Sequence, residues 1–187
     1  GEDTEAHLAQ VFRVICRAEV PDDGLLFDAD TLRVTVIRED QQYQGRRVEM
    51  RAYLGKTRIA VRIDVGFGDV VNPKPEEIDY PVLLDLPVPH IRTYPPEAVV
   101  AEKLQAMVVL GILNSRMKDF YDLRVLAEQF PFDGSILARA ITATFERRRT
   151  ALPTEPPIAL TAEFGMNADK VTQWQAFLRR SRLEARP

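Results

Sequence analysis

The chain has 187 residues, of which 45% are hydrophobic, so it is long enough to bury the core of one domain or of two small ones. Its single cysteine excludes a scaffold built on disulfides, and its formal net charge of -3 by itself indicates neither a nucleic-acid nor a membrane partner. The sequence has no apolar run that would span a bilayer and no signal-peptide pattern at its start, which predicts a cytoplasmic protein without a membrane partner.

An amphipathic helix is the first predicted element, over residues 4–19. Leu8, Phe12 and Ile15 recur at spacings of three to four residues, which is typical of a helix that packs one face against a core. A proline and an Asp-Asp-Gly turn follow and end this helix. Cys16 lies within it, where a lone thiol is typical of a small buried side chain rather than a nucleophile.

Three segments of alternating or β-branched residues follow, at 32–40, 46–55 and 57–69, and they predict an antiparallel meander. The Asp-Ala-Asp sequence at 28–30 has the spacing of a two-carboxylate metal clamp. It precedes a strand, whereas such a clamp would follow a Gly-Ser turn, so we interpret it as turn and strand-entry chemistry.

A proline-rich connector over residues 70–96 excludes a long helix and separates the strands from a helical region. Helices are expected at residues 96–110, 117–129, 134–148 and 168–183. The fold class is therefore α+β, with residues 1–89 forming a domain of one helix and antiparallel strands and residues 90–187 forming a helical domain. The second part carries a net positive charge, which makes it the better place to look for a polyanion.

Asp64 is the first candidate for chemistry. Ile59, Val61 and Ile63 alternate onto one face of the third strand, so Asp64 must lie on the other face, just before two glycines. A carboxylate at the end of a strand suits a hard cation such as Mg2+. The alternative is a solvated aspartate, or one in a salt bridge with Arg62 or with a neighbouring strand, and the geometry alone favours this alternative.

Lys103 is unusual because it lies on or beside the apolar stripe of the helix predicted at 96–110, close to Val99, Val100 and Met107. Such a lysine either extends its ammonium group to solvent or holds it in a cleft as a fixed phosphate-binding charge. The pattern favours neither interpretation.

The sequence NSRMKDFYDL, at 114–123, clusters charges at the start of the next helix. Asp119 and Asp122 share a helix face, and Lys118 is placed to pair with Asp122. Acidic residues in a first helical turn also oppose the helix dipole, which explains them without any function. Ser115, Arg116 and Lys118, together with free backbone N–H groups, would instead suit phosphate oxygens.

Several other catalytic motifs are missing from the sequence. It contains no glycine-rich phosphate loop, no HExxH and no GxSxG, and its two histidines lie far apart. Zinc hydrolases and serine hydrolases of the usual kinds are therefore unsupported.

Three segments, at 62–69, 94–134 and 137–153, together resemble the AbiEii/AbiGii nucleotidyltransferase toxin family, and the likeness extends over nearly the whole chain. The resemblance implies a nucleotidyltransferase-like fold of the DNA polymerase β type, with a partly truncated sheet and a helical carboxyl-terminal part. It also implies a toxin that is paired with a cognate antitoxin. Some members transfer a nucleotide from an NTP to the 3' end of tRNA with Mg2+.

The resemblance also implies roles for particular residues. Asp64 would help to hold Mg2+, while Lys103 and Lys118 would neutralise the triphosphate or the tRNA backbone. Asp119 or Asp122 would orient a nucleophilic hydroxyl, a lysine or the nucleotide. We therefore expect Asp64 and the two lysines to converge on one cleft.

The family pattern also includes a Gly-Ser turn followed by Asp-x-Asp, and this chain begins too late to contain it. We therefore expect either the carboxyl-terminal piece of a longer enzyme or a degenerate product, with weak or no activity. The alternative function is a non-catalytic binding or self-associating module, which forms a homo-oligomer through its incomplete sheet. A third and weaker interpretation is a basic helical RNA-binding domain.

Overall fold

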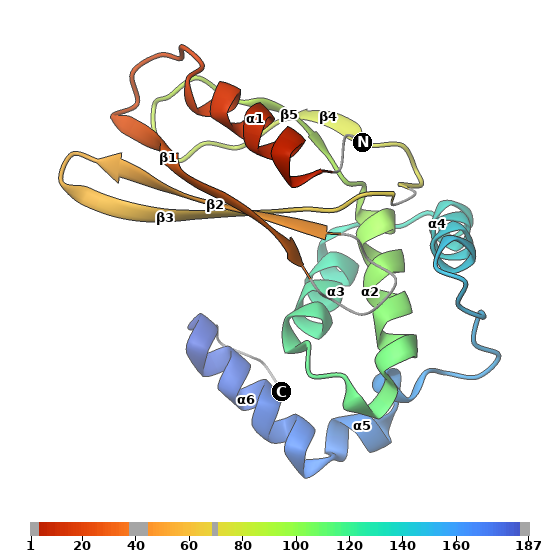
Figure 1. Cartoon of the computed structure of the whole chain (residues 1–187). Coiled ribbons are helices and arrows are strands. Elements are labelled where there is room, and N and C mark those ends of the chain that lie inside the picture. Colours follow the sequence, from red (N-terminus) through yellow and green to blue (C-terminus); the bar gives the residue numbers. More distant parts are fainter. Residues whose placement is uncertain (1–3, 38–44, 69–70, 184–187) are drawn as a thin grey trace. The chain divides into compact units, whose positions relative to one another are not determined.

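A computed structural model describes residues 4–37, 45–68 and 71–183 of the chain (Figure 1). The chain divides into two compact units: one comprises Gly1–Asp69 with Leu84–Leu86, and the other comprises Val70–Leu83 with Pro87–Pro187. Helices and strands are both present, which agrees with the expected α+β class. The division expected from the sequence, between residues 89 and 90, stays a prediction.

The first unit consists of one helix and a three-stranded antiparallel sheet of order β1-β2-β3. Its elements are α1 (Glu5–Cys16), β1 (Leu25–Ile37), β2 (Gly45–Leu54) and β3 (Thr57–Val65). Helix α1 begins after Thr4, whose hydroxyl accepts the N–H of His7 at 3.2 Å and so satisfies one open donor of the first turn. The predicted helix and meander are confirmed.

One face of this sheet packs against α1. Leu32, Val48 and Met50 form the buried centre, and Phe12 and Cys16 of the helix pack against them. Burial raises the pKa of the Cys16 thiol, so it stays protonated at neutral pH, as expected for a packing residue. Because strand residues alternate, the other face carries the polar side chains of β2 and β3, and this is the face to which Asp64 belongs.

The Asp-Ala-Asp segment lies inside β1, so the interpretation that it precedes a strand was wrong. The pairing of β1 with β2 shifts register between Asp28 and Arg33, and we call this irregularity of the ladder the bulge of β1. At this bulge the Asp28 carboxylate accepts the N–H of Asp30 at 3.2 Å, and the Thr31 hydroxyl donates to the Asp28 carbonyl at 2.7 Å. The side chains of this segment therefore form the local hydrogen bonds typical of a turn, but they form them within the strand.

The second unit begins with a short hairpin that the sequence did not predict, β4 (Glu76–Asp79) paired antiparallel with β5 (His90–Thr93). The expected helices follow, with a further short helix before the last one. They are α2 (Pro96–Leu110), α3 (Met117–Gln129), α4 (Gly134–Arg147), α5 (Ala162–Met166) and α6 (Ala168–Ser181), with 3-10 turns at Gly111–Leu113 and Ile158–Leu160.

The core of the second unit joins α6 to α3. Its buried centre includes Met107, Met117, Phe164 and Phe177. The Tyr121 ring of α3 lies 6.0 Å from the Phe177 ring of α6, measured between centroids, so the two helices are held by aromatic contacts. Within the part of the chain that the structure describes, no helix has the length and apolar character required to cross a bilayer.

Candidate active site

Lys103, in the middle of α2, is held by two carboxylates of α3. Its Nζ atom lies 2.5 Å from Oδ1 of Asp119 and 2.8 Å from Oδ2 of Asp122. The side chains of Lys103 and Asp119 are each only 17% exposed. Asp119 and Asp122 reach the same ammonium because residues three apart share a helix face, as the sequence predicts. Lys103 therefore neither extends freely to solvent nor lies unpaired in a cleft.

Lys118 completes this cluster from the solvent side. Its Nζ atom lies 2.6 Å from Oδ2 of Asp122, which confirms the predicted pairing across one helical turn. The Lys118 side chain is 72% exposed, so this pair is the exchangeable part of the cluster. We call Lys103, Lys118, Asp119 and Asp122 the lysine–aspartate cluster. Their formal charges cancel.

The electrostatics keep the inner groups ionised. Burial disfavours the charged form of Asp122, but hydrogen bonds from Lys103 and Lys118 outweigh it and hold the pKa of that carboxyl below its usual range. Burial also disfavours the charged form of Lys103, but hydrogen bonds to Asp119 and Asp122 outweigh it and raise the pKa of the ammonium group. At neutral pH Lys103 is therefore a fixed cation and not a general base.

The segment before α3 is fixed by a buried lysine from the other end of the unit. Lys170 of α6 is 8% exposed, and its Nζ atom donates to the backbone carbonyl of Asn114 at 2.8 Å. The fully buried Asn114 in turn accepts the N–H of Arg116 on its side-chain oxygen at 2.9 Å. No side chain within the described residues caps the start of α3 at Arg116, which leaves the positive end of the helix dipole for anions.

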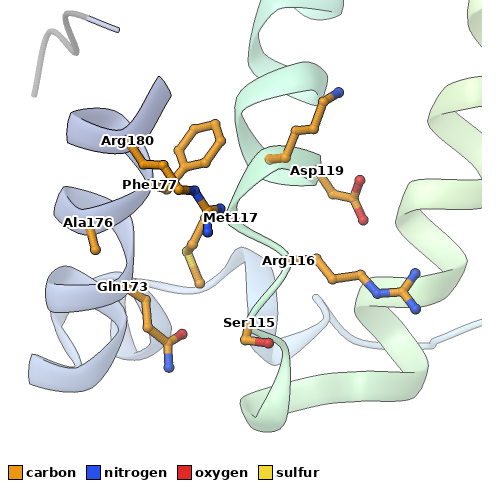
Figure 2. A pocket seen from close by; sticks show the side chains of 9 residues that line it. Ser115, Arg116, Met117, Asp119, Gln173, Ala176, Phe177 and Arg180 are labelled. Carbon is orange, nitrogen blue, oxygen red and sulfur yellow. The ribbon is translucent and has the colours of Figure 1, made fainter. Parts of the chain in front are cut away.

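An open pocket of about 560 Å³ lies between the start of α3 and α6 (Figure 2). Ser115, Arg116 and Lys118, predicted from the sequence as phosphate-binding residues, all line it. Gln173 and Arg180 of α6 also line it, and sequence reasoning missed them as site residues. The sequence contains only a weak signal for Arg180, because a basic last helical turn such as that of α6 is usually a solvated helix face.

Asp64 belongs to the first unit, where it forms a bidentate salt bridge across the sheet. Arg47 of β2 donates through Nε to Oδ1 at 2.7 Å and through Nη2 to Oδ2 at 2.8 Å. The hydrogen bond from Arg47 is the main reason why the pKa of Asp64 lies below its usual range. The predicted alternative of a salt bridge to a neighbouring strand is therefore confirmed. That Asp64 meets the two lysines stays a prediction.

The carboxylates of the candidate site residues suit Mg2+ only in part. Among the residues that the structure describes, no three His, Cys, Asp or Glu side chains gather where they could hold a metal ion. Mg2+ needs as few as one or two protein carboxylates when substrate phosphates and water supply the other oxygens. Asp64 is 50% exposed and can serve as one such ligand once Arg47 releases it. Asp119 and Asp122 are less suitable, because Lys103 already occupies the space between them.

Comparisons with known proteins identify the family of the chain. Residues 1–187 match the family model described as "Nucleotidyl transferase AbiEii toxin, Type IV TA system". A comparison with curated proteins gives no match. The family match covers the lysine–aspartate cluster, the pocket and Asp64 alike. The chain therefore belongs to the AbiEii family of nucleotidyl transferase toxins of type IV toxin–antitoxin systems.

Proposed function

We propose that this protein transfers a nucleotide from an NTP to an acceptor such as tRNA, with Mg2+, and that a cognate antitoxin restrains it. The observation that carries the proposal is the Lys103 ammonium, fixed between Asp119 and Asp122 on two packed helices. Family membership supports the class of reaction. The NTP, the acceptor and Mg2+ are our proposal.

Nucleotidyl transfer concentrates negative charge on the triphosphate and on the departing pyrophosphate, so a fixed cation is the main requirement of the site. Lys103 meets the positional part of this requirement, because Asp119 and Asp122 hold its ammonium in place. Its charge would become available to a phosphate when Asp122 turns to the attacking hydroxyl. A lysine positioned before the substrate binds needs little reorganisation in the transition state. We assign Lys103 the role of neutralising the triphosphate.

The other members of the cluster divide the remaining tasks. Lys118 is exposed and can leave Asp122 to follow an incoming phosphate. Asp122, released in this way, would accept a hydrogen bond from the attacking hydroxyl, while Asp119 keeps Lys103 in place. When bound, Mg2+ would supply Lewis-acid stabilisation of phosphate oxygens, and Asp64 is the residue that we propose as its ligand.

A non-catalytic, self-associating module is the second candidate function, because the sheet of the first unit is small. Within residues 4–37, 45–68 and 71–183, β1 and β3 each pair with β2 alone, so each leaves one edge open. Open strand edges pair readily with another chain. A monomer at high concentration, measured by analytical ultracentrifugation, would contradict this second function.

A transfer assay tests the main proposal. The complete translated gene product is incubated with tRNA, Mg2+ and each radiolabelled NTP in turn, and labelled tRNA is measured. Lys103→Met and Asp122→Asn should reduce transfer by about 100-fold or more, which is typical for loss of a group that stabilises transition-state charge. The matched control is Glu128→Gln, which removes an exposed carboxylate from α3, the helix of Asp122, and breaks its pair with Arg124.

The proposal fails if folded Lys103→Met protein transfers nucleotide as fast as Glu128→Gln protein. It also fails if the wild-type gene product, tested with every NTP and with total tRNA, labels no acceptor. Thermal unfolding of each variant checks that a loss of transfer does not come from a loss of structure.

A further inference from the structure

The pocket between the start of α3 and α6 has a composition that the lysine–aspartate cluster does not explain. Three of its lining residues are cationic, namely Arg116, Lys118 and Arg180, and one, Asp119, is acidic. The charge of Asp119 is already balanced by Lys103 on the neighbouring helix. Lys118 is likewise paired with Asp122, so the four charges of the lysine–aspartate cluster cancel. Arg180, which forms no ion pair among the described residues, adds a positive charge to the pocket, and this charge favours an anionic ligand.

Arg180 is far in the sequence from the start of α3, and the fold brings it to the pocket. It lies in the last turn of α6, and Figure 2 shows its side chain extending from α6 toward the start of α3. Gln173, two turns earlier on α6, adds an amide that can donate to a phosphate oxygen. Both residues approach the ligand space from α6, and Ser115 lies across from them on the segment before α3, so a ligand would be held between α6 and this segment. The Arg116 side chain extends away from α6.

The walls of the pocket are fixed before any ligand binds. Lys170 joins α6 to the segment before α3 through its 2.8 Å bond to the Asn114 carbonyl, and it also donates to Gln173 at 3.4 Å. The Trp174 and Phe177 rings, 5.6 Å apart between centroids, pack against α3 beneath the pocket. A rigid site loses little conformational entropy on binding, which raises its affinity for a ligand that fits.

The size of the pocket points to more than a single phosphate group. Its volume of about 560 Å³ lies within the range of about 300–1,000 Å³ that is typical of small-molecule sites. Met117, Ala176 and Phe177 give it an apolar floor beside the charged residues. A ligand in which a phosphate is attached to a sugar or a base would contact the charged residues with its phosphate and the apolar floor with the rest.

We infer that this pocket is a phosphate subsite for a nucleotide unit, with Arg180 as its ligand-binding cation from α6. The subsite adjoins the lysine–aspartate cluster, because Lys118 and Asp119 belong to both. The identity of the phosphate carrier rests on the proposed function. It is either the NTP itself or a phosphate of the acceptor RNA, and both present the same group to Arg180.

A pair of neighbouring arginines offers a matched test. Arg180→Gln removes the positive charge that α6 contributes to the pocket, while Arg179→Gln removes an equal charge from the same exposed helical turn outside the pocket. Ala176→Leu is an independent variant, since it leaves the charge unchanged and fills part of the pocket. The probes are inorganic triphosphate, each NTP and a short single-stranded RNA, and the complete gene product is titrated with each by calorimetry or fluorescence anisotropy.

We expect Arg180→Gln and Ala176→Leu to weaken binding of at least one probe by about tenfold, and Arg179→Gln to change it by less than about twofold. Weaker binding of triphosphate and NTP assigns the subsite to the nucleotide, whereas weaker binding of RNA alone assigns it to the acceptor. Equal effects of the two arginine variants, or no effect of Arg180→Gln on any probe, would overturn the subsite.

The binding titrations do not depend on catalysis, so the two proposals fail separately. Binding that depends on Arg180, in a protein that transfers no nucleotide, would overturn the proposed function and retain the subsite. Transfer that requires Lys103 but is indifferent to Arg180 and Ala176, in both binding and rate, would retain the function and overturn the subsite.

Discussion

The two units use the same chemistry, a basic side chain paired with a carboxylate, in different surroundings. In the first unit Arg47 pairs with Asp64 on the open face of a sheet, where both side chains contact solvent. In the second unit Lys103 pairs with Asp119 and Asp122 between two helices, where solvent reaches little of the lysine side chain. The first pair is readily exchanged, whereas the second is fixed. A fixed cation that is held by two carboxylates near the start of α3, beside a pocket, is the feature that indicates a site.

The largest loss of stability should follow from removing the Lys103 ammonium. Lys103→Met leaves Asp119 and Asp122 ionised with less compensation, and we expect the free energy of unfolding to fall by about 2–3 kcal/mol. Lys118→Met, which removes the exposed partner of Asp122, should cost less than about 1 kcal/mol. Urea denaturation of the two variants measures both values. Equal losses of stability in the two variants would contradict the conclusion that Lys103 is held more firmly than Lys118.

A second test concerns the buried lysine that fixes the segment before α3. Lys170→Met keeps most of the apolar stem but leaves the Asn114 carbonyl without its donor, which should cost about 1–2 kcal/mol. Hydrogen exchange should also become faster at the start of α3 while the sheet of the first unit is unaffected. Unchanged exchange at residues 114–119 would show that Lys170 does not hold this segment.

The third test uses pH, and its sign follows from the direction of each pKa shift. The pKa of Asp122 is lowered in the folded protein, so its contribution to stability is present above its unfolded pKa of about 4 and is lost as the pH falls through the folded value. The pKa of Lys103 is raised, so its contribution is lost only as the pH rises through that raised value, above about 10. Asp122→Asn should therefore flatten the acid limb of the stability profile measured by urea denaturation between pH 7 and 3. An acid limb of unchanged slope would contradict this assignment.

The smallest effect is expected at the exposed pair of the sheet. Arg47→Gln should lower the free energy of unfolding by less than about 1 kcal/mol, and added salt should reduce the difference further. Thermal unfolding at low and high ionic strength measures it. A larger loss that persists in high salt would mean that Arg47 and Asp64 are as firmly held as the lysine–aspartate cluster.

Much of the fold could be predicted from local patterns in the sequence. Helices α2 and α3 begin and end at the predicted residues, because Pro96 suits a first helical position and Gly111 adopts a positive φ of 50° after Leu110. The hairpin of β4 and β5 was missed because its strands have four residues each and lie among prolines. The early start of β1 was missed because the side chains of its bulge are those of a turn.

The candidate site could be predicted only where one helix contains it. The pairing of Lys118 with Asp122 follows from their spacing, and so does the shared face of Asp119 and Asp122. That Lys103 supplies their common cation depends on how α2 packs against α3, and no local pattern encodes this packing. The contribution of Arg180 depends on the aromatic contacts between α3 and α6, which join residues far apart in the chain.

The role of Lys103 in catalysis can be measured as the rate of nucleotide transfer by Lys103→Met protein, relative to that of Glu128→Gln protein. Both substitutions remove one charge from a helix of the same unit, but only the first reaches the lysine–aspartate cluster. We expect a ratio of about 0.01 or lower at saturating NTP, with both proteins folded at the assay temperature. A ratio near one would contradict the claim that the ammonium of Lys103 neutralises the reacting phosphate.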